Sequence, residues 1–104
     1  MHLTQATKEK IKNNVLKELS TDKSIKKIVV FGSFVNSNEP DDMDLAIFSE
    51  SDGDYLTLAM EYRRKLRNIA REIPIDVIPI KVPCDEFSFI REINNGEVIY
   101  EKRD

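Results

Sequence analysis

The stretch Ile28–Phe48, IVVFGSFVNSNEPDDMDLAIF, decides the fold of this chain. It begins with a β-branched and aromatic run at residues 28–31, which predicts a buried strand. The run stops at Gly32 and Ser33. A glycine lets the backbone approach a ligand closely, and a serine adds a hydroxyl donor beside the main-chain N–H groups. The sequence therefore predicts a strand that ends in a tight, polar turn.

A polar loop and a second strand follow this turn. Turn-forming residues dominate positions 36–41, and Asp42-Met43-Asp44-Leu45 then opens the second strand. Side chains alternate along a strand, so Asp42 and Asp44 are expected on one face and the apolar residues on the other. Two neighbouring carboxylates repel each other, and the pair is unfavourable unless a positive group lies between them.

Composition and length exclude several classes of protein. The chain has 104 residues, of which 40% are hydrophobic and 34% charged, as expected for one globular domain over residues 1–104. A formal net charge of −3 gives no overall attraction to nucleic acid or to an anionic membrane. No apolar run approaches the roughly 20 residues of a membrane span, and the N-terminus lacks a signal-peptide pattern. The single Cys84 cannot form an internal disulfide, so we expect a reducing, cytoplasmic location.

Two amphipathic helices are expected on either side of the opening stretch. The first covers about Thr4 to Leu19, with an apolar face and lysines on the remaining faces. The second covers about Asp54 to Glu72. Its predicted apolar stripe comprises Tyr55, Leu58, Ala59, Tyr62, Leu66, Ile69, Ala70 and Ile73. Another face carries Arg63, Arg64, Arg67 and Arg71. These arginines form either a docking stripe for an acidic partner or RNA, or a solvated face favoured by the helix dipole.

A third strand is predicted at residues 75–80. Pro79 cannot donate to a strand ladder, so this strand is expected at an edge of the sheet. Asp76 is a lone charge within it, and such acids persist where they are paired or bind a metal. From the residues alone, Asp76 is either a metal ligand or the partner of a lysine such as Lys81.

The remaining residues complete the predicted fold. A short helix over about Asp85 to Ile93 and a tight turn at 94–96 lead to a last strand at 97–100. The order of elements is then αβ-βαβ-αβ. This order predicts an α/β (α+β) fold, in which helices pack against one small mixed β-sheet.

Three motifs together resemble the nucleotidyltransferase superfamily. They are Gly32-Ser33 after a hydrophobic strand, Asp42-x-Asp44 at the start of the next strand, and Asp76 in a later strand. The small size of the chain and its ending, from the helix at 85–93 to the strand at 97–100, look most like the minimal nucleotidyltransferase (MNT) group. The resemblance extends over nearly the whole chain.

The resemblance implies a reaction and a role for each motif. Members of the superfamily move a nucleoside monophosphate from a triphosphate to an acceptor hydroxyl, and pyrophosphate leaves. By resemblance, Asp42, Asp44 and Asp76 are the catalytic residues and hold Mg²⁺, expected as two ions, with Asp76 beside the attacking hydroxyl. Gly32 and Ser33 would bind the β- and γ-phosphates of the nucleotide, expected to be ATP.

Members of the minimal group are often antitoxins of a helical HEPN toxin, and some transfer AMP onto a toxin tyrosine. The resemblance therefore implies an antitoxin that modifies a HEPN-like partner, encoded next to it, and that forms homo- or hetero-oligomers. Two alternatives stay open: a non-catalytic module that neutralises its partner by contact, and a nucleotide-binding sensor. Two differences from the family bear on phosphate binding. The loop at residues 34–41 is slightly short, and Phe34 stands where many members carry an arginine.

Overall fold

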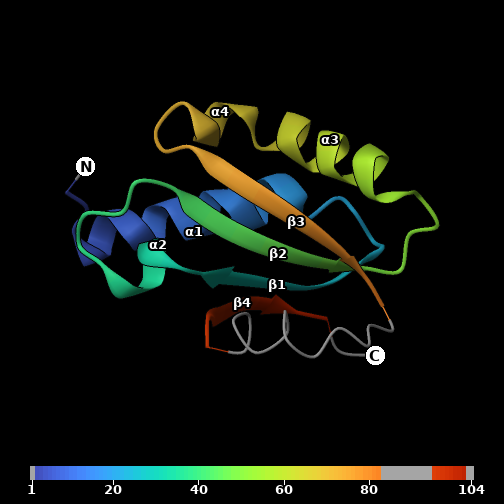
Figure 1. Ribbon diagram of the computed structural model, residues 1–104, viewed down its shortest axis with the longest axis horizontal. Helices are drawn as coiled ribbons and strands as arrows, with labels where there is room; N and C mark the ends of the chain where they lie inside the picture. The colour runs from blue at the N-terminus through green and yellow to red at the C-terminus, as the bar shows by residue number, and fades with distance from the viewer. Residues whose placement is uncertain (1, 83–94, 103–104) are drawn as a thin grey trace.

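The computed structural model describes residues 2–82 and 95–102 (Figure 1). Its helices are α1 (Gln5–Leu19), α2 (Ser33–Asn36), α3 (Tyr55–Lys65) and α4 (Arg67–Ala70). Its strands are β1 (Ile25–Phe31), β2 (Met43–Ser49), β3 (Ile75–Lys81) and β4 (Glu97–Glu101). Cys84 and the short helix predicted at about Asp85 to Ile93 lie outside the described residues, as does the first residue of the predicted turn at 94–96.

The four strands form one mixed sheet in the order β3-β2-β1-β4. Strand β1 runs antiparallel to both β2 and β4, whereas β2 and β3 are parallel, so the predicted mixed sheet is confirmed. Pro79 lies in β3 at an edge of this sheet, as its missing N–H group predicted. Strand β1 begins at Ile25, earlier than predicted, because Lys26 and Lys27 belong to the strand. The ammonium of Lys27 lies 5.6 Å from the ring centroid of Phe48 on β2, which keeps this lysine on the sheet surface.

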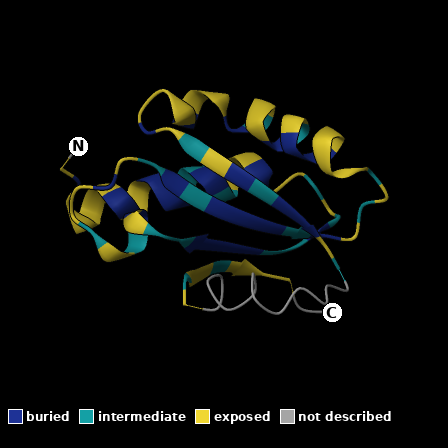
Figure 2. Cartoon of the chain, in the orientation of Figure 1, coloured by how far each residue is buried: buried dark blue, intermediate teal, exposed yellow. Residues whose placement is uncertain are grey.

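The main hydrophobic core lies between one face of the sheet and helices α1 and α3. Met43, Leu45 and Ile47 of β2 belong to this core and are fully buried. Ala46 belongs instead to a smaller cluster with Val29, so the predicted alternation along β2 is confirmed. Figure 2 shows the same division, with buried residues along the central strands and exposed residues on the outer sides of the helices.

Helix α1 differs from the prediction at its lysines. Its apolar residues Ile11 and Val15 are buried as expected, and Thr4 caps its N-terminus. Lys8 and Lys12 were expected on solvent-facing sides but are buried. Together with Ile11 and Val15 they follow the i, i+3, i+4, i+7 spacing of one helix face, so they lie on the side turned toward the rest of the fold. Their long stems pack there while the ammonium groups reach polar partners.

The second predicted helix is divided at Leu66 into α3 and α4. The backbone angles of Leu66, φ −98° and ψ 9°, lie outside the helical range, although hydrogen bonds continue across it from Ala70 N to its carbonyl. The apolar stripe is buried at most positions, including Leu66 itself and Ile73. The prediction is wrong for Tyr55 and Ala70, which are exposed because they stand at the two ends of this helical segment.

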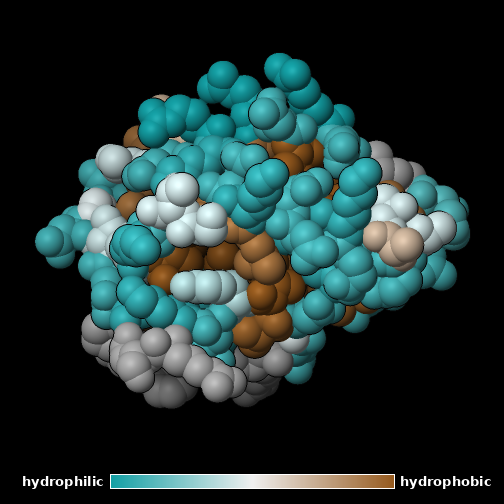
Figure 3. All heavy atoms as spheres, turned by 180° about the vertical axis from the view of Figure 1, so that it is seen from behind, coloured by the Kyte–Doolittle hydropathy of each residue, from teal (hydrophilic) through white to brown (hydrophobic). Residues whose placement is uncertain are grey.

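The outer surface of α3 and α4 is mixed, because the apolar residues Tyr55, Leu56 and Met60 of α3 are exposed together with charged side chains. The four arginines of the predicted stripe, Arg63, Arg64, Arg67 and Arg71, are exposed. Seen from behind (Figure 3), the molecule is largely hydrophilic, and hydrophobic side chains gather around a central hollow. Within the described ranges, no helix combines the length and the apolar character that crossing a membrane requires.

Candidate active site

Three aspartates meet at one end of the sheet. Asp42 immediately precedes β2, and Asp44 lies in β2 opposite Asp76 in the parallel neighbour β3. One carboxylate oxygen from each residue lies within 4.8 Å of the other two. The structure therefore brings together the three acids that the sequence singled out, two from the start of β2 and its preceding residue and one from a strand distant in the chain.

The fold explains which way these carboxylates face. Strand β2 turns its apolar residues into the main core, so Asp44 lies on the opposite face of the sheet. Asp42 and Asp44 are half-buried, whereas Asp76 is exposed on its edge strand. Lys81 stands at the other end of β3 and donates to the main-chain oxygen of Asp52 at 3.5 Å. It is not the partner of Asp76 that the sequence left open.

The electrostatics of the cluster disfavour full ionisation. Burial raises the pKa of the Asp42 carboxyl, and the charge of Asp76, a hydrogen bond with it and the charge of Asp41 raise it further. Burial also raises the pKa of Asp44, and the charges of Asp42 and Asp76 add to the effect. No basic side chain is among the causes that shift either group. The cluster thus has the electrostatics of a cation site.

Gly32 lies against this cluster at the end of β1. Its backbone angles, φ 78° and ψ −153°, belong to a region that is essentially restricted to glycine. A Cβ atom at this position would stand 2.5 Å from Oδ2 of Asp44, closer than real contacts allow. Both observations require glycine here, and they place the backbone of the turn directly beside a carboxylate of the cluster.

Helix α2 follows Gly32 at once and was not predicted from the sequence. The Gly32 carbonyl accepts hydrogen bonds from Val35 N at 3.1 Å and Asn36 N at 3.3 Å, and the Ser33 carbonyl accepts from Ser37 N at 2.8 Å. The predicted loop at 34–41 is thus helical at its start. Phe34 is 1% exposed and packs in the core, so its side chain is directed away from a ligand at the turn, whereas Ser33 is exposed.

Sequence reasoning missed one residue near this turn, Lys8 of α1. Its Nζ donates to the main-chain oxygen of Ser37 and lies 5.6 Å from the ring centroid of Phe34. A signal for it existed, since Lys8 interrupts the apolar face of α1 at the helical spacing. The lysine ties α1 to the segment between Gly32 and the aspartates.

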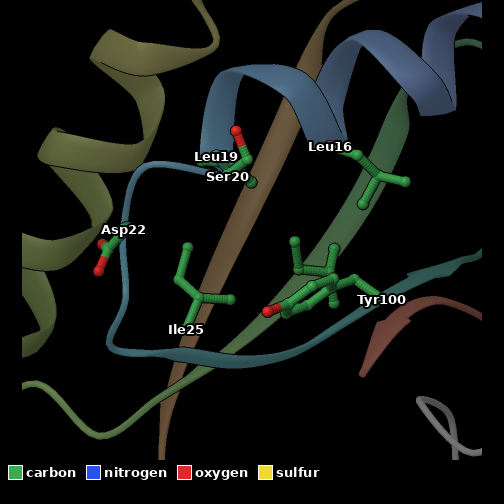
Figure 4. Close-up of a pocket in the computed structure, with 7 residues that line it drawn as sticks. Leu16, Leu19, Ser20, Asp22, Ile25 and Tyr100 are labelled. Atoms are coloured by element: carbon green, nitrogen blue, oxygen red, sulfur yellow. The ribbon is translucent and has the colours of Figure 1, made fainter. Parts of the chain in front are cut away.

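A hollow away from the aspartates contains none of the predicted site residues. It has a volume of about 150 Å³ and is lined by Leu16, Leu19, Ser20, Asp22, Ile25, Ile28 and Tyr100 (Figure 4). Its walls are mainly apolar, and Asp22 brings a negative charge. Such walls do not satisfy phosphate oxygens. This hollow is therefore not a candidate site for phosphate chemistry.

We expect Asp42→Asn to stabilise the metal-free protein at pH 7, on the order of 0.5 kcal/mol, the scale of partly exposed charge pairs. The folded pKa of Asp42 lies above its ordinary value of 3.8, so this group binds protons more readily in the folded state. Its contribution to the free energy of unfolding therefore improves as pH falls through the raised pKa, and the advantage of the variant disappears toward pH 4.

Urea denaturation of parent and variant with a chelator, at several pH values, measures this difference. Comparison with the parent is needed because the pKa values of three other carboxyl groups are lowered in the folded state, so their protonation in acid destabilises the protein. These groups are Glu9, Asp22 and Asp54. Asp41→Asn is the graded control: Asp41 lies outside the cluster and its charge is the smallest cause of the raised Asp42 pKa, so it should give a smaller effect of the same sign. An Asp42→Asn variant that is less stable than the parent at pH 7 would contradict the repulsion described above.

The sequence and the fold are similar to those of known proteins. Residues 9–104 match the family model described as polymerase beta, nucleotidyltransferase. No curated protein matches the sequence. A chain in the structure of a tri-AMPylated Shewanella oneidensis HEPN toxin in complex with an MNT antitoxin superposes with a TM-score of 0.66 and 18% identity, over 91% of this chain and 73% of that chain. A chain in a toxin–antitoxin structure with AMP-PNP has a TM-score of 0.67 and 18% identity, over 88% and 74%. At these identities the likeness establishes a shared fold.

Proposed function

The chain belongs to the polymerase beta nucleotidyltransferase family, and on this premise we propose that it transfers AMP from ATP to a hydroxyl group of a partner protein. The observation that carries the proposal is the convergence of Asp42, Asp44 and Asp76 beside the turn at Gly32. Nucleotidyl transfer builds negative charge on a phosphoryl group and on a departing pyrophosphate. A site for it must bind cations and phosphates next to each other.

The donor set fits Mg²⁺. Carboxylate oxygens are the hard ligands that this ion prefers, and three of them lie within 4.8 Å of one another. The raised pKa values of Asp42 and Asp44 support the same assignment, because a bound cation would relieve their repulsion. We propose that Asp42, Asp44 and Asp76 hold Mg²⁺, as two ions. When bound, Mg²⁺ would neutralise charge on the phosphates and the leaving group.

The residues of the chain have distinct parts in the proposed reaction. The turn at Gly32 and the exposed hydroxyl of Ser33 bind the β- and γ-phosphates and orient the triphosphate. The acceptor oxygen forms a bond to the α-phosphorus, the bond to the α–β bridging oxygen breaks, and pyrophosphate leaves with that electron pair. Asp76 lies at the exposed edge of the cluster, where an acceptor can approach, and it takes the hydroxyl proton.

We propose a helical HEPN-type protein as the partner that bears the acceptor hydroxyl. Similar folds occur in an MNT antitoxin complex with a tri-AMPylated HEPN toxin and in a toxin–antitoxin structure with AMP-PNP. The present chain would then act as an antitoxin, encoded beside its partner. The single Cys84 supports a reducing, cytoplasmic setting for the pair.

Labelled ATP tests this function. The purified chain and its HEPN-type partner are incubated with Mg²⁺ and ATP labelled on either the α- or the γ-phosphate, and the proteins are separated. Transfer of AMP moves the α-label to the partner and leaves the γ-label in pyrophosphate. Labelling from the γ-position would instead indicate phosphoryl transfer and would overturn the proposal, as would α-labelling that persists with a chelator.

One observation favours a second function. Position 34 carries the uncharged and buried Phe34, whereas many members of the superfamily have an arginine there, so this position gives no positive charge to the phosphates. A weak phosphate site is compatible with a module that neutralises its partner by contact and retains the nucleotide site without turnover. Suppression of the partner without transfer of either label would establish this alternative.

We expect Mg²⁺ with ATP to stabilise the folded protein by about 2.7 kcal/mol when the nucleotide is in hundredfold excess over its Kd. For a domain of this size the melting temperature rises by on the order of 10 °C. ATP with a chelator should give a much smaller shift, because the carboxylates then repel the phosphates. Thermal denaturation with Mg²⁺ alone, ATP alone and both together measures the effect. The absence of a Mg²⁺-dependent shift at millimolar ATP would contradict the proposed site.

A further inference from the structure

Lys8 is a buried cation next to the turn at Gly32. Only 6% of this residue is exposed. Its Nζ donates a hydrogen bond of 2.5 Å to the main-chain oxygen of Ser37 and lies 5.6 Å from the ring centroid of Phe34. Phe34 belongs to α2 and Ser37 caps the end of that helix. Lys8 thus contacts the short helix that directly follows the turn.

Lys12, one turn further along α1, provides a contrast. It is equally buried, but its Nζ lies 2.8 Å from a carboxylate oxygen of Glu9 and 2.6 Å from one of Glu97. Among residues 2–82 and 95–102, no carboxylate forms an ion pair with Lys8. Its charge faces a carbonyl oxygen and an aromatic ring instead. Buried charges are normally compensated, so an anion close to Lys8 is electrostatically favoured.

The contacts of Lys8 connect it to the phosphate-binding turn. Ser37 N donates to the Ser33 carbonyl at 2.8 Å, so the residue that Lys8 holds is itself bonded to the turn. Leu3 N adds a second tie to this segment through the Asn38 carbonyl at 2.8 Å. Helix α2 is one turn long, about 6 Å, which is shorter than the Debye length of about 8 Å at physiological ionic strength, so a charge at one end of this helix can act on a ligand at the other end.

We propose that Lys8 is a positioning residue of the nucleotide site, which holds α2 and the turn in place and whose uncompensated charge favours a triphosphate beside Ser33. This inference rests on the proposed function. It also explains how the site tolerates Phe34, because the positive charge comes from α1 through the buried side of α2 rather than from position 34 itself.

Binding of Mg²⁺ with ATP, ADP or AMP, measured by calorimetry at a temperature where circular dichroism shows each variant folded, tests the proposal. Lys8→Gln keeps a hydrogen-bond donor for Ser37 and removes the charge. It should raise the Kd for ATP about tenfold, the equivalent of about 1.4 kcal/mol, with a smaller effect on ADP and the smallest on AMP. Lys8→Arg should bind ATP within about threefold of the parent. Because the turn contacts the β- and γ-phosphates, its displacement would also give a graded loss, so the deciding comparison is between the two variants. A merely structural role would leave Lys8→Gln, which keeps a donor, closer to the parent in Kd for ATP, whereas the charge predicts rescue by Lys8→Arg alone.

Lys12→Gln is the matched control, since it removes a second buried lysine from the same helix. It should lower stability and leave the Kd for ATP within about twofold. Should Lys8→Gln be unfolded, Lys8→Arg and Lys8→Met are compared in its place, with the same expected grading for Lys8→Met. An unchanged Kd for ATP in a folded, uncharged Lys8 variant, or an equal loss for ATP and AMP, overturns the inference alone. A parent protein that binds no Mg²⁺-ATP overturns the proposed function, and the inference with it.

Discussion

Replacing Asp44 by asparagine is expected to abolish nucleotidyl transfer. Asp44 lies in β2 with Asp42 just before that strand and Asp76 opposite it on the neighbouring strand. A neutral amide of the same size cannot hold Mg²⁺ as a carboxylate does. The loss should amount to roughly 4 kcal/mol of transition-state stabilisation or more, about a thousandfold in rate. The measurement is the initial rate of α-label transfer to the partner at saturating ATP.

The same substitution should leave the fold and the partner complex intact. Asp44 has a raised pKa in the folded state, so removal of its charge does not destabilise the metal-free protein at neutral pH. Asp41→Asn is the control for a nearby acid outside the cluster and should retain most activity. An Asp44→Asn protein that transfers label as fast as the parent would show that the assigned site is wrong.

Gly32→Ala is expected to damage both stability and function. The backbone angles of Gly32 are essentially restricted to glycine, and forcing another residue into them costs about 1–3 kcal/mol. The new Cβ would also stand 2.5 Å from Oδ2 of Asp44, so the turn or the carboxylate has to move. We expect a melting temperature lower by about 10 °C and transfer reduced at least tenfold, because displacement of about 1 Å in a catalytic site is enough for such a loss.

Gly53→Ala is the matched control. Gly53 has no left-handed backbone, and a Cβ there would meet Leu58 at 3.3 Å, which asks for only a small shift of a side chain. It should therefore melt close to the parent and transfer label at a similar rate. Equal melting temperatures and equal transfer rates for the two alanine variants would show that the close approach of Gly32 to Asp44 is not needed for stability or transfer.

The strands that carry the acids could be predicted because their signals are local. Alternation along β2 separates Met43 and Leu45 from Asp44, and Pro79 indicates an edge strand. The pairing of Asp44 with Asp76 is not local, since it depends on the parallel register of β2 and β3. The sequence suggested their proximity only through its resemblance to a family.

Helix α2 could not be predicted for a related reason, and the local signal for the burial of Lys8 is confined to its spacing on the apolar face of α1. Residues 33–36 have no helical periodicity, and turn formers follow them immediately. The short helix forms because Phe34 packs in the core and because Gly32 adopts angles that start it. Lys8 is buried against the same helix. Hydropathy predicts that a lysine is exposed to solvent, whereas the ammonium of Lys8 contacts the Ser37 carbonyl oxygen and the Phe34 ring.

The boundary between α3 and α4 was also not predicted from the sequence. The apolar stripe continues through Leu66 to Ile73 without Pro or Gly, which predicts one continuous helix. Leu66 leaves the helical region while it remains buried, so the break is a consequence of packing. Helix propensity cannot register this kind of tertiary constraint.

The edge position of β3 has a consequence for solubility. In the described part of the chain, β3 pairs on one side only, and unpaired strand edges are templates for aggregation. Three residues of β3 oppose such association: Pro79 removes a donor, and the exposed Asp76 and Lys81 add charges. Asp76 therefore has two roles: it is a proposed metal ligand, and its charge disfavours pairing of the β3 edge with another chain.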